Sequence, residues 1–174
     1  MALAHVNLAI LALERDDWKA GAREAQEALS AVGGSADGLI TSITQVILGE
    51  SLLAGGDIDG AAECFERVRA DSKAAGHPLA AAGASRGMGR VLLARGEAAA
   101  ASAELHSACE AYRGLKRAQE ESRTQLWLAR ALAAAGDTPG ALACAREAQS
   151  RFLQMRAKHD CERAAALLRE LGDG

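Results

Sequence analysis

The sequence predicts an all-α protein built from stacked helical hairpins, and three observations support that fold class. The 174-residue chain is 49% hydrophobic but only 3% aromatic, and it has two prolines. This composition favours close-packed helices over sheets, because alanine has the best helix propensity and strands prefer β-branched and aromatic residues. Turn-like residue pairs recur every 40 residues, and apolar residues recur at helical spacing on both sides of each turn.

The turn pairs define a repeat that runs through the chain without insertion or deletion. They are Asp16-Asp17, Gly56-Asp57, Gly96-Glu97 and Gly136-Asp137. A large apolar residue stands eight positions before each turn, and these are Leu8, Leu48, Met88 and Leu128. A small residue stands five positions after it, and these are Gly21, Ala61, Ala101 and Ala141. Small residues at these positions let two antiparallel helices cross closely, so each unit is predicted to be a helical hairpin.

Nine helices follow from this register and from local start and stop signals. They are expected over 2–14, 17–32, 37–54, 58–75, 78–95, 98–114, 117–135, 138–156 and 160–171. Asp37, Pro78, Pro139 and Asp160 are start signals, and Gly33-Gly34 is a stop signal. An acid at each turn, as at Asp57, Glu97 and Asp137, is expected to cap the helix that follows. We expect a single array over 1–174, with repeats of about 1–36, 37–76, 77–116 and 117–157 and a cap helix over 158–172.

Three segments carry a family resemblance: LGESLLAGGDIDGAAECFERV, MGRVLLARGEAAAASAELHSA and LARALAAAGDTPGALACAREA. Their order of residues resembles the tetratricopeptide repeat (TPR) signature. The resemblance implies a right-handed superhelical array of four TPR-like helical hairpins with a C-terminal capping helix. The 40-residue unit is longer than the usual 34 and is similar to that of kinesin light chain and of large bacterial multidomain regulators. HEAT and armadillo repeats have a comparable period but commonly carry a proline in the first helix, which this chain lacks.

Composition and motifs argue against several function classes. The net charge is −3, which provides no basic footprint for nucleic acid. Apolar runs fall short of the roughly 20 residues that span a bilayer, so we expect no membrane association and a cytoplasmic location. Phosphate-binding, nucleophile-elbow and zinc-protease motifs are missing, and the four cysteines form no CxxC pair. We therefore expect no enzyme activity, no cofactor, no metal, and reduced structural cysteines.

The TPR resemblance implies that a partner binds to the first helix of each repeat. On the concave face it implicates Asn7, Ile10, Ile43, Ile47, Glu50, Arg86, Arg90, Arg123, Trp127 and Arg130. Paired guanidiniums suit the capture of a carboxylate or phosphate, and a tryptophan adds stacking area. Alternatively, Glu50 pairs with Arg90 while Glu120 or Glu121 neutralises Arg123, and such surface pairs imply no ligand.

Two functions follow as hypotheses. The first is a protein–protein interaction scaffold that binds a protein or peptide through the concave groove, an acidic segment being one candidate. The second is a self-association or intramolecular docking domain of a larger bacterial signalling or transcription regulator. The second hypothesis rests on the stretch LAHVNLAIL, whose apolar character indicates either that the chain is an excised piece of a longer protein or that its N-terminal end is covered by another chain, as in a homo-oligomer.

Overall fold

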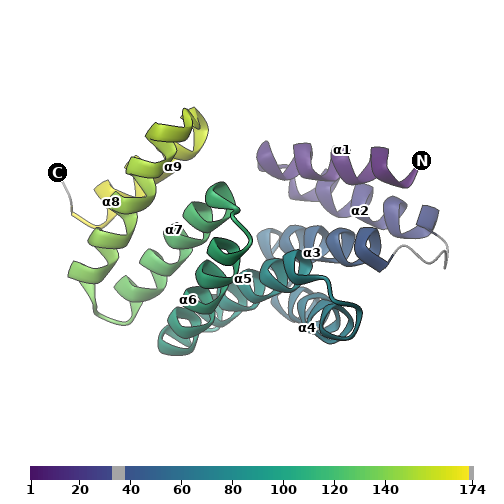
Figure 1. Cartoon of the computed structure of the whole chain (residues 1–174), viewed down its shortest axis with the longest axis horizontal. Coiled ribbons are helices and arrows are strands. Elements are labelled where there is room, and N and C mark those ends of the chain that lie inside the picture. The colour runs from purple at the N-terminus through teal and green to yellow at the C-terminus, as the bar shows by residue number, and fades with distance from the viewer. Residues whose placement is uncertain (33–37, 173–174) are drawn as a thin grey trace. The chain divides into compact units, whose positions relative to one another are not determined.

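The computed structural model describes residues 1–32 and 38–172, and these form two compact units that divide between Val91 and Leu92 (Figure 1). The described residues form helices and turns without a strand, so the all-α prediction is confirmed. The helices are α1 Ala2–Glu14, α2 Trp18–Val32, α3 Gly38–Ala54, α4 Ile58–Ala75, α5 Pro78–Ala94, α6 Ala98–Gly114, α7 Ala118–Ala134, α8 Thr138–Met155 and α9 Lys158–Glu170. The signals at Gly33-Gly34 and Asp37 lie outside the described residues.

The last helix begins earlier than the sequence indicates. Its N-cap is Ala157 and its first residue is Lys158, whereas Asp160 was expected to mark the start. Asp160 lies instead in the first turn of α9, where its side chain is buried and bonded to α7. The acid that looks like a cap in the sequence is therefore a contact between two helices.

The recurring turns share one backbone conformation. Gly56, Gly96 and Gly136 have φ of 88°, 81° and 90°, in the left-handed region that glycine adopts without a Cβ clash. The residue that follows each glycine is the N-cap of the next helix. Asp57 accepts a hydrogen bond from the Gly60 amide at 3.0 Å, and Asp137 accepts one from the Gly140 amide at 2.9 Å.

The capping prediction is therefore confirmed for the two aspartates and wrong for Glu97. Glu97 occupies the same N-cap position but makes no side-chain cap bond. Its extra methylene group carries the carboxylate past the amides that a short N-cap side chain reaches. The repeat thus keeps its backbone turn even where the side-chain cap is lost.

In unit 1 the core is organised around one aromatic ring. Phe65 on α4 is fully buried and packs with Val46 of α3 and Val91 of α5. The ring lies against two helical glycines: a Cβ built on Gly49 would meet Phe65 Cε1 at 2.7 Å, and a Cβ on Gly87 would come still closer. Glycine at both positions makes room for a phenylalanine where the other repeats carry smaller side chains.

In unit 2 the core joins three consecutive helices. Phe152 of α8 is fully buried and packs with Leu126 of α7 and with Leu167 and Leu168 of α9. A second cluster places Leu105 of α6 against Leu128 of α7. The last helix thus covers the apolar face that α8 would otherwise leave open, as a capping helix does.

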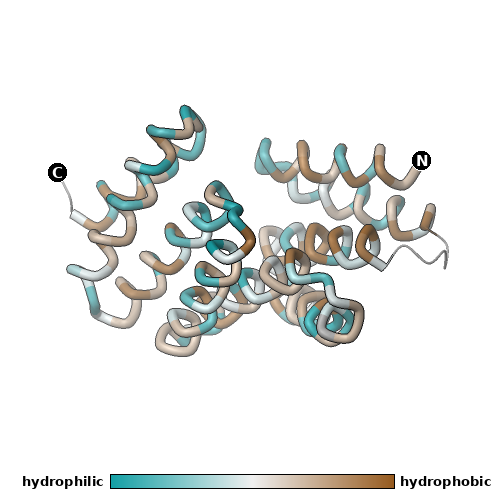
Figure 2. The backbone as a smooth tube through the Cα atoms, in the orientation of Figure 1, coloured by the Kyte–Doolittle hydropathy of each residue, from teal (hydrophilic) through white to brown (hydrophobic). Residues whose placement is uncertain are grey.

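Hydropathy varies along the helices, and the most apolar stretches fall on α1 and α3 (Figure 2). Even so, no helix in the described part of the chain combines the length and apolarity needed to cross a bilayer. The apolar residues of α3 contribute Val46 and Ile47 to the cores of unit 1. Those of α1 are divided between buried and exposed positions.

The contact between Gly87 and Phe65 generates the first prediction. Gly87→Ala should lower the free energy of unfolding by about 1–3 kcal/mol, because the added methyl group overlaps the buried ring. Gly114→Ala is the matched control: its Cβ would meet nothing within 4 Å, so it should be neutral or slightly stabilising. Urea unfolding of the two variants measures the difference, and equal midpoints would contradict this packing.

Candidate functional site

The predicted apolar strip of unit 1 is partly surface and partly core. Asn7 and Ile10 on α1 are exposed. Ile47 on α3 is buried in a cluster with Val6, and Ile43 is half-buried against the same cluster. Ile47 therefore contributes packing, and the groups open to a partner in this part of unit 1 are Asn7 and Ile10.

In the same unit, Glu50 of α3 faces two arginines of α5. Its Oε1 lies 2.5 Å from Arg86 Nη2 and 3.8 Å from Arg90 Nη1, and all three side chains are largely buried. The pairing of Glu50 with Arg90 was a sequence hypothesis and is confirmed, whereas the closer contact with Arg86 was not foreseen.

In unit 2, Arg123 of α7 is neutralised by Asp160 of α9. Arg123 Nε donates to both carboxylate oxygens at 2.9 and 3.0 Å, and Gln119 donates to Oδ2 at 2.9 Å. Asp160 is only 2% exposed. The alternative that Glu120 or Glu121 neutralises Arg123 is therefore wrong, because the charge that reaches it comes from the next helix along the stack.

Glu121 forms ion pairs with two other arginines. Its buried carboxylate lies 2.9 Å from Arg113 of α6 and 2.8 Å from Arg151 of α8. One carboxylate on α7 thus links the two helices that flank it. Like Asp160, it is a buried acid satisfied by arginines from neighbouring helices.

Trp127 is half-buried and packs against the cluster that contains Leu105 and Leu128. The Arg130 guanidinium lies 5.6 Å from the centroid of its ring, a cation–π distance. Arg130 Nη1 also donates to Glu170 of α9 at 3.0 Å. Trp127 therefore has one side in the core and one side beside an arginine at the surface.

Asp160 and Glu170, both on α9, are the site residues that sequence reasoning missed. A usable signal exists: Glu170 lies 40 residues after Arg130, as Arg90 lies 40 residues after Glu50. Residues one repeat apart face each other across consecutive first helices. Extending the register one step beyond the fourth repeat would have treated α9 as a first helix and found Glu170.

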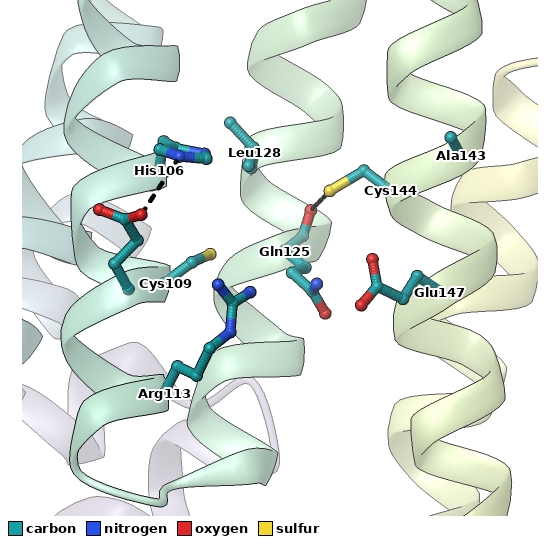
Figure 3. Close-up of a pocket in the computed structure, with 9 residues that line it drawn as sticks. His106, Cys109, Arg113, Gln125, Leu128, Ala143, Cys144 and Glu147 are labelled. Atoms are coloured by element: carbon teal, nitrogen blue, oxygen red, sulfur yellow. Dashed lines mark hydrogen bonds and ion pairs between the residues drawn. The ribbon is translucent and has the colours of Figure 1, made fainter.

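Unit 2 also contains a cleft of about 280 Å³ between α6 and α8, with α7 behind it (Figure 3). Cys109 reaches towards it from α6 and Cys144 from α8. The two thiols donate to main-chain carbonyls, Cys109 to Glu121 at 3.9 Å and Cys144 to Gln125 at 3.4 Å. Burial raises the pKa of Cys109 to about 12 and that of Cys144 to about 11.

These thiols are therefore neutral at physiological pH and act as packing groups rather than nucleophiles. His106, on the rim of the cleft, pairs with Glu110 at 3.8 Å, and both side chains are exposed. In the described part of the chain, no group of three or more His, Cys, Asp or Glu residues is placed to hold a metal ion.

The tetratricopeptide repeat model matches residues 43–67 and 122–147, which cover most of the α3–α4 and α7–α8 hairpins. The chain is a TPR-like repeat protein. The two matched segments are the second and fourth of the 40-residue units, one in each compact unit. A search of curated protein sequences finds no match.

Solved structures with similar folds include two of MamA. A MamA RS-1 ArsTM double mutant is 19% identical with a TM-score of 0.51, and MamA residues 41 to the end from Desulfovibrio magneticus RS-1 are 18% identical with the same score. Each alignment covers 99% of this chain and 93% of the MamA chain. At this identity the likeness concerns the fold, which agrees with the TPR-like helical hairpins described above.

The thiols of the cleft generate a prediction about reactivity. At pH 8, Cys109 should be alkylated by iodoacetamide about 1,000-fold more slowly than in the unfolded chain, and Cys144 about 100-fold, because their pKa values rise from 9 to about 12 and about 11. Peptide mass spectrometry of timed samples measures each site separately. Rapid native labelling of either thiol would contradict its burial.

The contact between Asp160 and Arg123, which holds α9 against α7, generates a prediction about stability. Asp160→Asn should destabilise unit 2 by about 2 kcal/mol, a figure below that for a fully buried pair because Arg123 is partly exposed. Glu170→Gln breaks the exposed pair with Arg130 and should cost no more than about 0.5 kcal/mol. Thermal unfolding followed by circular dichroism compares the two; similar losses would show that α9 does not depend on Asp160.

Proposed function

We propose that this protein is an interaction scaffold that binds an acidic segment of a partner protein through arginines on its first helices. The TPR-like fold supports the general function, because a stack of helical hairpins offers an extended surface to a partner. The contact of Glu50 with Arg86 and Arg90 supports the more specific proposal that the bound segment is acidic. Two guanidiniums held at one carboxylate are oriented in advance, and both have the geometry that binds a carboxylate of a partner in a bidentate way.

Partial burial strengthens this recognition. Charges that are shielded from water interact more strongly than charges on an open surface. The Glu50, Arg86 and Arg90 side chains are largely buried, so an incoming carboxylate would meet guanidiniums whose positions are already restricted. Less conformational entropy is lost when such a group binds a ligand.

Unit 2 contributes a second element to the proposal. The Trp127 ring and the Arg130 guanidinium lie together on α7, and Arg130 is tied to the exposed Glu170. An exposed ion pair contributes little stability, so a partner carboxylate can replace Glu170 at small cost. The same arginine would then hold the partner while Trp127 supplies apolar area.

Charge removal tests this function. Binding of a fluorescein-labelled glutamate-rich peptide, followed by fluorescence anisotropy at low salt, should weaken at least about tenfold in the Arg86→Gln/Arg90→Gln double variant, since each charged contact contributes on the order of 1 kcal/mol. Arg117→Gln/Arg169→Gln removes the same charge from exposed positions and should change binding by less than about twofold. Equal losses of affinity in both variants would show that binding depends only on net charge. Unchanged affinity in both variants would show that Arg86 and Arg90 are not the binding site.

A second candidate function is association through α1, as self-association or docking to another domain. The observation that favours it is the exposure of large apolar side chains on this helix, among them Leu3, Leu8 and Leu11. A monomeric soluble protein rarely leaves several such residues together on one surface. This surface is separate from the arginines of α5, so the two candidate functions can be tested independently.

A further inference from the structure

The cleft of unit 2 contains a buried hydrogen-bond acceptor that has no donor. Gln125 of α7 lines the cleft and is only 4% exposed, and its Oε1 is buried without a hydrogen-bond partner. Buried polar atoms are nearly always paired, because an acceptor withdrawn from water loses its hydrogen bonds to water. This oxygen therefore favours a ligand that brings a donor into the cleft.

Two carboxylates share the cleft with this oxygen. Glu110 of α6 and Glu147 of α8 belong to its lining, and Figure 3 shows the Glu147 carboxylate directed toward the Gln125 amide. Their side chains are 64% and 52% exposed, so the cleft opens to solvent where they stand. Carboxylates and an amide oxygen are all acceptors. Together they favour a ligand that has several N–H donors and a positive charge.

The arginines nearest to these acids are held by contacts within unit 2. Arg113, which also lines the cleft, lies 2.9 Å from Glu121, and Arg151 lies 2.8 Å from the same residue. Arg151 also lies 2.7 Å from Oε1 of Glu147. A carboxylate has about four lone-pair positions, so Glu147 can accept from a ligand while it keeps this contact.

The size and the remaining walls of the cleft indicate what fits. Its volume of about 280 Å³ is at the lower end of the range for small-molecule sites, roughly 300–1,000 Å³, so it suits a group the size of one side chain. Leu128, Ala143 and the neutral thiols of Cys109 and Cys144 add apolar surface. An arginine side chain matches both parts, because a planar group with five N–H donors ends an apolar stem.

The equivalent positions of unit 1 lack these acids. Two repeats earlier, Gln45 stands at the position of Gln125, and its Oε1 is also buried without a partner. However, Arg67 stands at the position of Glu147, and a serine stands at that of Glu110. A cationic ligand would be repelled there, so the acceptor recurs while the acids are particular to unit 2.

We propose that the cleft between α6 and α8 binds an arginine side chain of a partner protein. The guanidinium donates to Gln125 Oε1 and to the Glu147 carboxylate, and the methylene groups lie against Leu128. This site goes beyond the proposed function, in which arginines of this chain bind an acidic segment. The two sites share no residue and take opposite charges, so either can fail without the other.

Titration followed by nuclear magnetic resonance tests occupancy of the cleft. With N-acetyl-arginine amide, the side-chain amide of Gln125 and the backbone amide of Cys144 should shift saturably, with a common Kd on the order of 1 mM for one side chain. N-acetyl-citrulline amide has the same shape without the charge and should bind at least about tenfold more weakly. Equal binding of the two probes would overturn recognition by charge. No saturable shift at roughly 10 mM arginine probe would overturn the site.

A peptide probe distinguishes a partner's side chain from a free small cation. The blocked tripeptide acetyl-Gly-Arg-Gly-amide should bind at least as tightly as N-acetyl-arginine amide, because the cleft opens to solvent beside Glu110 and Glu147. Loss of binding in the tripeptide would show that the cleft admits only a free molecule and would overturn the assignment to a partner protein.

Substitutions locate the contact, with the Cys144 backbone amide as the readout. Gln125→Leu should weaken binding of the arginine probe about tenfold and Glu147→Gln about fivefold, because each removes an acceptor of a charged donor. Gln45→Leu and Glu162→Gln make the same changes outside the cleft, the second at an exposed position of α9, and should alter affinity less than about twofold.

Thermal unfolding checks that the cleft variants fold. Gln125→Leu should be as stable as the wild type, because its Oε1 has no hydrogen bond to lose. If it is unstable, the exposed Glu147→Gln substitution answers the same question. Wild-type affinity in a folded cleft variant would place binding elsewhere and overturn the proposal.

Discussion

The close approach of the two helices in each hairpin is the constraint on which the rest of the structure depends. The small residue five positions after each turn, Gly21, Ala61, Ala101 or Ala141, is buried in every repeat. A larger side chain there would separate the helices and move every contact that the hairpin makes with the next one. Because the spacing is kept, residues at fixed repeat positions meet between α3 and α5 in unit 1 and between α7 and α9 in unit 2.

That regular spacing explains how the charges are arranged. Glu50 meets Arg90, and Arg130 meets Glu170, in each case one repeat apart. Each pair joins one first helix to another within the same compact unit. In the proposed function, a partner that brings a carboxylate would exchange one ion pair for another, which favours specificity for charge over a large gain in affinity.

The helices α1 and α9 differ in the faces they leave exposed. In unit 2, α9 covers the apolar face of α8 and presents charged residues outward, with Asp160 held by Arg123. In unit 1, α1 keeps apolar residues at positions that are buried in the later repeats. The two helices therefore differ in what they leave at the surface, charged residues on α9 and apolar residues such as Leu8 and Leu11 on α1.

The sequence by itself determined the helices, the turns and the repeat period, because capping, left-handed turn residues and apolar spacing act between residues close in the chain. It also determined which residue types lie on the first helices. Only the tertiary structure decided that Ile47 is core, that Arg123 binds Asp160 rather than Glu121, and that Trp127 is half-buried. A helix can turn about its axis without changing its sequence pattern, so the neighbour that each side chain meets is set by how helices distant in the chain pack together.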